Sequence, residues 1–205
     1  MGRPALLRRG LRLEYLTVGW NVLEGLIAIA AGMASGSVAL IAFGMDSFVE
    51  TISGLVLVWR LRAEQRGGLG EDEVERVERR AQLLVGGSFL LLAAYVAFES
   101  VRTLVAAEAP DASPVGIVLT LVSIAVMLWL ARAKLETGRA LGSRALIADS
   151  RQTRACWYLS AVALAGLGLN ALLGWWWADP VAALAIAVLL VREGWEALSG
   201  EDDDD

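Results

Sequence analysis

The stretch that decides the fold is residues 38–59, which read VALIAFGMDSFVETISGLVLVW. Only two of these 22 residues are charged. A helix needs about 20 mostly apolar residues to cross the hydrocarbon core of a bilayer. The run is too long for a strand, and an open sheet cannot span lipid because its edge groups would lack hydrogen-bond partners. The stretch therefore predicts a transmembrane helix.

The rest of the chain has the same character. Of its 205 residues 57% are hydrophobic, and its mean hydropathy of +0.56 exceeds that of a typical soluble domain. We expect an all-α, polytopic membrane protein with one domain over residues 1–200 and an acidic, disordered tail at 201–205. The six expected transmembrane helices cover residues 13–31, 38–59, 81–101, 115–131, 145–173 and 180–198.

Basic residues predict the orientation, because short cytoplasmic loops retain lysine and arginine. The N-terminus, the charged loop at 61–80 together with Arg60 just before it, and the basic loop at 132–144 hold 14 basic residues, whereas the alternate side has only Arg102. Both termini are therefore expected in the cytoplasm. The net charge of −5 comes from the acidic tail, since residues 1–200 are balanced.

The composition restricts the possible chemistry. The chain has no histidine and one cysteine, Cys156. A metal site would have to use carboxylate, amide, hydroxyl, thiolate or backbone oxygen ligands. No nucleophile with an adjacent base and no phosphate-binding glycine loop is present, so we expect neither an enzyme nor a resident cofactor. No basic patch interleaved with aromatic residues suggests nucleic acid.

Two acids lie inside the second predicted helix, where ionisable groups are costly and often functional. Asp46 and Glu50 are four residues apart and share one face, with Ser53 close to it. They could pair with arginines of neighbouring helices. We favour a cation between them, because two acids without a basic residue in their own helix core would repel each other.

The fifth predicted helix carries polar residues on one face. Asp149, Gln152, Thr153 and Cys156 fall within about 100° of arc. In line with Asp149 and Gln152, the thiol of Cys156 becomes a plausible metal ligand. For Gln152, metal ligation and an interhelical hydrogen bond remain equally open.

The first predicted helix has a polar stripe of its own. We interpret Glu14 and Thr17 as packing residues. The deeper Asn21 and Glu24 could line a cation path, or pair with arginines of the fifth helix.

Two short patterns complete the motifs. Residues 37–42 (SVALIA) and 143–148 (SRALIA) form a weak repeat. Asp46 and Gln152 each lie four residues after the end of one copy, and Glu50 and Cys156 each lie eight residues after it. Asp179 followed by a proline at position 180 fits the N-cap and first turn of the last helix.

These motifs resemble the cation diffusion facilitator family. The similar parts are GSVAL at 36–40, DSFVE at 46–50, Ala148-Asp149 before Gln152 and Cys156, and WADP at 177–180. The resemblance covers the transmembrane unit. It implies a dimeric, proton-coupled exporter of zinc, cadmium, cobalt, iron or manganese.

The resemblance also implies a transport site, with two acids on the second helix and two ligands on the fifth. In this chain the positions are Asp46, Glu50, Gln152 and Cys156, and Asp149, Asn21 and Glu24 are possible additional ligands or path-lining residues. Gln152 and Cys156 stand where the family usually has histidine or aspartate, and Glu50 replaces an aspartate. We also expect the family's C-terminal cytoplasmic domain to be missing.

The expected function is export of a divalent transition metal across the bacterial inner membrane in exchange for protons. The expected homodimer would form through the third helix, where Gly86, Gly87 and Ser88 permit close approach. One alternative is a membrane metal sensor or accessory protein that does not transport. Another is a structural bundle whose polar residues only pack.

Overall fold

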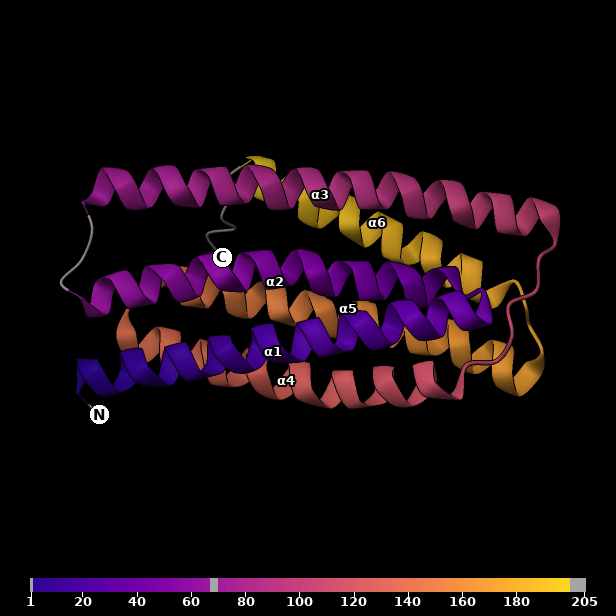
Figure 1. Ribbon diagram of the computed structural model, residues 1–205, viewed down its shortest axis with the longest axis horizontal. Helices are drawn as coiled ribbons and strands as arrows, with labels where there is room; N and C mark the ends of the chain where they lie inside the picture. The colour runs from indigo at the N-terminus through magenta and orange to yellow at the C-terminus, as the bar shows by residue number, and fades with distance from the viewer. Residues whose placement is uncertain (1, 67–69, 200–205) are drawn as a thin grey trace.

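The computed structural model describes residues 2–66 and 70–199, apart from the side chains of 71–75 and 78. The described residues form six helices and contain no strand, which confirms the predicted all-α fold (Figure 1). The acidic tail expected at 201–205 lies outside the described residues. The helices are α1 (Arg3–Ser35), α2 (Val38–Gln65), α3 (Glu71–Ala106), α4 (Pro114–Leu141), α5 (Arg144–Leu173) and α6 (Ala178–Ser199).

Most helices are longer than the apolar runs that predicted them. α1 begins at Arg3 instead of residue 13, α3 begins at Glu71 instead of 81, and α4 ends at Leu141 instead of 131. The charged loop expected at 61–80 is therefore mostly helical. The added turns are rich in arginine, glutamate, alanine and leucine, which favour helix in water as well as in lipid. Hydropathy detects only the part of a helix that lies in the membrane.

Five helices are long and apolar enough to cross a membrane: α1, α2, the part of α3 from Arg79, α4 and α5. α6 has the length, but each of its 18-residue windows carries at least three charged residues. It still lies along the bundle beside α3 (Figure 1). The structure therefore supports a polytopic membrane protein in which α6 completes the bundle.

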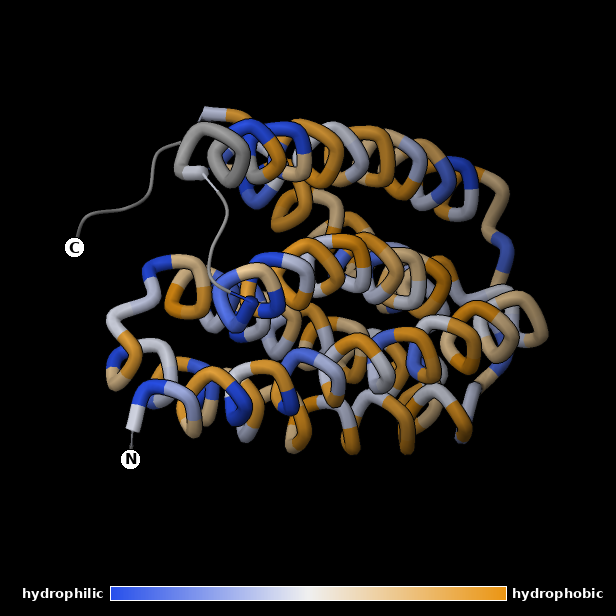
Figure 2. Tube along the Cα trace, turned by 60° about the vertical axis from the view of Figure 1, so that its left-hand side comes forward, coloured by the Kyte–Doolittle hydropathy of each residue, from blue (hydrophilic) through white to orange (hydrophobic). Residues whose placement is uncertain are grey.

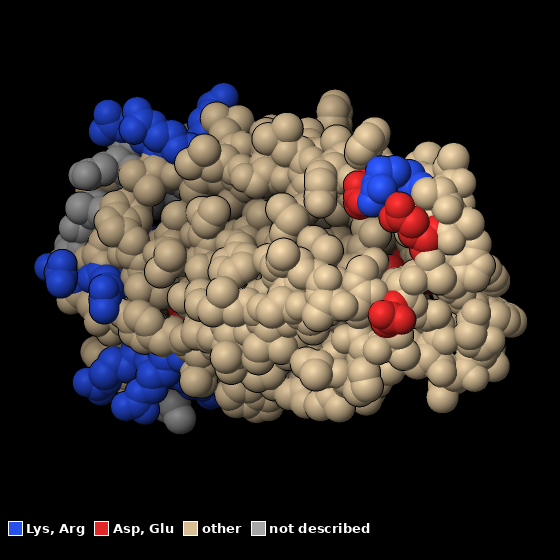
Figure 3. All heavy atoms as spheres, turned by 45° about the vertical axis from the view of Figure 1, so that its right-hand side comes forward, with Lys and Arg blue, Asp and Glu red and all other residues tan. Residues whose placement is uncertain are grey.

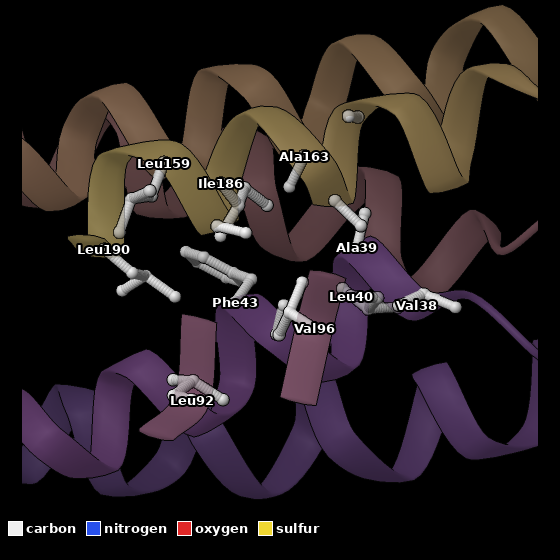
Figure 4. Packing of buried hydrophobic residues seen from close by; sticks show 14 of the residues in the cluster. Val38, Ala39, Leu40, Phe43, Leu92, Val96, Leu159, Ala163, Ile186 and Leu190 are labelled. Atoms are coloured by element: carbon white, nitrogen blue, oxygen red, sulfur yellow. The ribbon is translucent and has the colours of Figure 1, made fainter. Parts of the chain in front are cut away.

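The helices form two groups. The hairpins α1–α2 and α4–α5 pack together, and the pair α3 and α6 lies against α2 and α5 (Figure 1). The main apolar core fills the space between the groups, where Phe43 and Leu40 of α2 meet Val96 of α3 and Ile186 and Leu190 of α6 (Figure 4). This packing fixes α2 between its partners, and α2 carries the two predicted acidic ligands.

The hairpins α1–α2 and α4–α5 turn in the same way. The C-cap residue that follows α1 is Gly36, with φ of 73°, and the one that follows α4 is Gly142, with φ of 70°. This left-handed conformation favours glycine. The next residue in each hairpin, Ser37 or Ser143, caps the following helix by accepting a hydrogen bond from a backbone N–H three residues later.

The two hairpins also have a close contact between their helices at equivalent positions. A Cβ on Gly32 would lie 2.7 Å from Cγ1 of Ile41, and a Cβ on Gly138 would lie 2.9 Å from Cγ1 of Ile147. The short repeat noted in the sequence is thus a repeat of hairpin structure. It places Asp46 and Gln152 at equivalent positions of the two hairpins.

Asp179 does not cap its own helix, contrary to expectation. α6 already begins at Ala178, and the Asp179 carboxylate binds the N-terminus of α2 instead. Oδ2 accepts a hydrogen bond from Ser37 Oγ at 2.5 Å, and Oδ1 accepts from the backbone nitrogens of Val38 at 2.9 Å and Ala39 at 3.4 Å. The WADP segment therefore joins α6 to α2.

Basic side chains gather at the end of the bundle that holds the N-terminus, and the middle of the surface carries few charges (Figures 2 and 3). This arrangement agrees with the predicted orientation, which stays a prediction. Lys134 is an exception. It was assigned to a basic cytoplasmic loop, but it lies inside α4 and is fully buried.

Candidate metal centre

Helices α2 and α5 meet at the predicted metal residues. The Cys156 thiol donates a hydrogen bond to Oδ2 of Asp46 at 3.1 Å, and both side chains are buried. Further along the same interface, Ser53 Oγ donates to Oε1 of Gln152 at 3.0 Å. The structure therefore brings the two helices together on the faces that the sequence predicted.

The repeat of hairpins explains this pairing. α3 separates the hairpins in the chain, so α1–α2 and α4–α5 run in opposite directions along the bundle. Inverted repeats of this kind place equivalent segments face to face, with a substrate site near the middle of the membrane. Asp46 of α2 accordingly meets Cys156 of α5, and Ser53, farther along α2, meets Gln152.

Glu50 is the third member of the centre. It is buried, and its Oε2 accepts a hydrogen bond from Nδ2 of Asn21 at 2.8 Å. Its carboxyl also interacts with Asp46 and with the Cys156 thiol. Asn21 thus orients one of the two central acids, and its role in lining a cation path stays a prediction.

The centre offers two carboxylates and a thiol. Within the described part of the chain, no three Asp, Glu or Cys side chains already form a metal cage. Gln152 makes the interhelical hydrogen bond that was one of its two interpretations. Whether Asp46, Glu50, Gln152 and Cys156 ligate a metal remains a prediction.

Glu24 lies on α1 three residues after Asn21, whereas Glu14 lies seven residues before Asn21. Its Oε2 accepts a hydrogen bond from Ser47 Oγ and its Oε1 accepts from Trp20 Nε1, each at 3.1 Å. The Ser47 contact joins α1 to α2, and the Trp20 contact lies within α1. Together they keep a carboxylate close to the centre without placing it among the four predicted ligands.

Asp149 is bound to Lys134, which the sequence analysis had placed in a loop. The signal that could have found this lysine is the periodicity of α4. Its buried residues Met127, Leu130, Lys134 and Thr137 recur every three or four positions, so the buried face continues beyond the apolar run.

Comparisons with known proteins agree with this architecture. A model of the cation efflux transmembrane domain matches residues 16–199. The chain is 27% identical over 177 residues to the cation-efflux pump FieF of Shewanella oneidensis, covering 83% of this chain and 58% of that protein. It is 26% identical over 187 residues to the magnetosome protein MamB of a Magnetospira species, covering 89% and 61%.

FieF of Klebsiella pneumoniae is 29% identical over 183 residues, covering 84% of this chain and 59% of that protein. The chain therefore spans about three fifths of the length of these relatives. The matched part includes the two hairpins and the α3–α6 pair.

Proposed function

Because this chain belongs to the cation efflux family, we propose that it moves a divalent transition-metal cation out of the cell across the bacterial inner membrane. The observation that carries the proposal is the buried contact between Asp46 of α2 and Cys156 of α5, with Glu50 beside it. Names of relatives such as cation-efflux pump support the direction of transport.

The donor atoms favour a particular class of cation. Two carboxylates and a thiolate suit borderline ions such as Zn²⁺, Co²⁺, Cd²⁺ or Fe²⁺, whereas a thiolate is a poor ligand for Mg²⁺ and Ca²⁺. Gln152 lies one turn before Cys156 on α5 and can add an amide oxygen if it leaves Ser53. Cys156 is then the residue that biases the site toward softer metals.

Protons are the proposed counter-ions. The Cys156 thiol donates a hydrogen bond to Asp46, and a metal can bind this sulfur only after its proton has left. Gln152 does not titrate, so the two carboxylates and the thiol would carry the exchange. Two carboxylates close together do not readily both stay charged once the metal has gone, so protonation favours its release.

A homodimer is also proposed, on the basis of the family. Gly86 cannot serve as its contact, because a Cβ there would lie 2.9 Å from the backbone oxygen of Gly194 in α6. Gly87 has open space around it, and Leu84 and Leu91 on α3 are exposed. We place the contact on this face of α3. A mass of one chain in lipid nanodiscs would contradict it.

The test is metal flux into liposomes that contain a metal-sensitive dye and carry an imposed pH gradient. We expect Asp46→Asn to reduce Zn²⁺ flux at least tenfold, because the central carboxylate is lost. The control Asp111→Asn changes an exposed acid outside the centre and should leave flux unchanged. Equal flux in Asp46→Asn and wild type would overturn the site, and flux indifferent to the gradient would overturn proton exchange.

The alternative is a sensor or accessory protein with the same centre. It predicts that purified protein binds Zn²⁺, that Asp46→Asn weakens this binding, and that no flux occurs in liposomes. Binding and flux measured on the same preparation separate the two functions.

A further inference from the structure

A second buried polar cluster lies beside the metal centre. Nζ of Lys134 on α4 donates to Oε2 of Glu14 at 3.2 Å, to Oδ2 of Asp149 at 2.5 Å and to Oγ1 of Thr153 at 3.2 Å. The side chains of Lys134 and Glu14 are fully buried, and that of Asp149 is 11% exposed. Glu14, which was expected only to pack, therefore belongs to an ion-paired cluster of three helices. We call Glu14, Asp149, Thr153 and Lys134 the lysine cluster.

The lysine cluster is built like a cation site. Glu14, Asp149 and Thr153 come from α1 and α5 and present oxygen atoms to a single positive group. The other oxygen of Glu14, Oε1, is buried without a hydrogen-bond partner. A buried acceptor without a partner is costly, and a divalent ion can use more oxygen ligands than an ammonium can. The lysine cluster thus has one buried oxygen, Glu14 Oε1, that a bound cation could still use as a ligand.

A line of polar groups joins the lysine cluster to the metal centre. On α1, Asn21 lies two turns after Glu14, donates to Glu50, and keeps its own Oδ1 buried without a partner. On α5, Thr153 of the lysine cluster is adjacent to Gln152. In the described part of the chain, the buried side-chain oxygens without a partner are Glu14 Oε1 and Asn21 Oδ1, and both lie along this line.

The lysine cluster lies toward the basic end of the bundle. Asp149 is five residues into α5, which begins at the basic end, and Cys156 lies seven residues farther on. Seven residues of helix span about 10 Å. In the predicted orientation, a cation from the cytoplasm would therefore reach the lysine cluster before the metal centre.

We propose that Glu14, Asp149 and Thr153 form a second cation site on the cytoplasmic side of the metal centre, in which the Lys134 ammonium is a built-in occupant that an incoming divalent cation displaces. The identity of the transported ion rests on the proposed function, but the existence of the second site does not. Lys134 acts here as a tethered competitor, so that the acids are never left without a positive partner.

Packing alone does not explain the lysine cluster. Replacing a buried ion pair with apolar residues of similar size is often neutral or stabilising, so stability gives little reason to keep one. Charged residues inside transmembrane helices are rare and tend to mark ion pathways. Lys134 also interacts electrostatically with Glu50, which couples its position to the charge of the metal centre.

The experiment counts bound Mn²⁺ in full-length protein in which Asp46→Asn and Glu50→Gln have disabled the metal centre. Mn²⁺ is the probe because it accepts carboxylate and hydroxyl oxygens, and its free form gives a strong electron paramagnetic resonance signal. In this background Mn²⁺ has to displace the Lys134 ammonium, so adding Lys134→Met should lower the Mn²⁺ concentration that half-fills this one site per chain by about tenfold or more. Adding Glu14→Gln as well should remove that site.

Thermal unfolding of the same proteins provides the second readout. Mn²⁺ should raise the unfolding temperature of the Lys134→Met protein and should not raise that of the protein carrying both Lys134→Met and Glu14→Gln. If Lys134→Met is unstable alone, Mn²⁺ present during purification should restore its fold.

Equal Mn²⁺ affinity with and without Lys134 would overturn the role of Lys134 as a competitor, and a Lys134→Met protein that Mn²⁺ neither binds nor stabilises would overturn the second site. Because Asp46 and Glu50 are already replaced in every protein compared, this outcome is independent of the flux test of the metal centre.

Discussion

Removing the Asp179 carboxylate tests whether the junction between α6 and α2, the helix that carries the two acids of the candidate metal centre, stabilises the bundle. Asp179 is fully buried and accepts hydrogen bonds from Ser37 Oγ and from the backbone nitrogens of Val38 and Ala39. These are the first groups of α2, and Asp46 lies eight residues after Val38 on the same helix. The carboxylate also places a negative charge at the N-terminus of α2, where the helix dipole favours it.

The effect of Asp179→Ala follows from the three donors that lose their acceptor. A buried donor left without a partner costs about 1–3 kcal/mol. The bond to Ala39 is long at 3.4 Å, and the Ser37 hydroxyl can rotate toward another acceptor, so these two cost less than the bond to Val38. The lost charge at the helix terminus adds about 0.3–2 kcal/mol. We therefore expect Asp179→Ala to lower the free energy of unfolding by about 3–5 kcal/mol in total. Asp179→Asn keeps an acceptor oxygen and should lose only about 1–2 kcal/mol.

Thermal unfolding in detergent, followed by circular dichroism, measures the difference. For a domain of this size each kcal/mol lowers the midpoint by about 2–4 °C, so Asp179→Ala should unfold roughly 6–20 °C below wild type. The control Asp111→Ala removes an exposed carboxylate in the link between α3 and α4, and should match wild type. If Asp179→Ala unfolds together with wild type, or if Asp179→Asn is equally damaging, the capping argument is wrong.

Two further predictions concern packing and orientation. Gly44→Val should destabilise the protein by about 1–3 kcal/mol in the same unfolding assay, because a Cβ at Gly44 would lie 3.0 Å from the backbone nitrogen of Ile29 in α1. Gly19→Val on the exposed face of α1, where the added atoms meet open space, is its control and should unfold like wild type. In a Cys156→Ser background, a cysteine at the exposed position of Gln65 should react with a membrane-impermeant maleimide only after cells are opened, and labelling of intact cells would reverse the topology.

The sequence alone was sufficient for the fold class and for the faces on which α2 and α5 meet. A bilayer requires long apolar helices, so their number and order can be read from composition along the chain. Inside such helices polar residues are costly and therefore conspicuous. Asp46 and Glu50 on α2, with Cys156 on α5, were found in this way, and helix periodicity predicted that they share facing surfaces.

Only the tertiary structure decided which polar groups are partners. Hydropathy ended α4 too early and left Lys134 in a loop, although this residue binds Glu14, 120 positions away in the chain. The Asp-Pro pattern predicted that Asp179 caps its own helix, whereas its carboxylate binds the start of α2, more than 140 positions away. Local patterns specify helices because helical hydrogen bonds join residues four apart. Contacts between distant segments depend on how the hairpins pack, and no single segment of the sequence determines this packing.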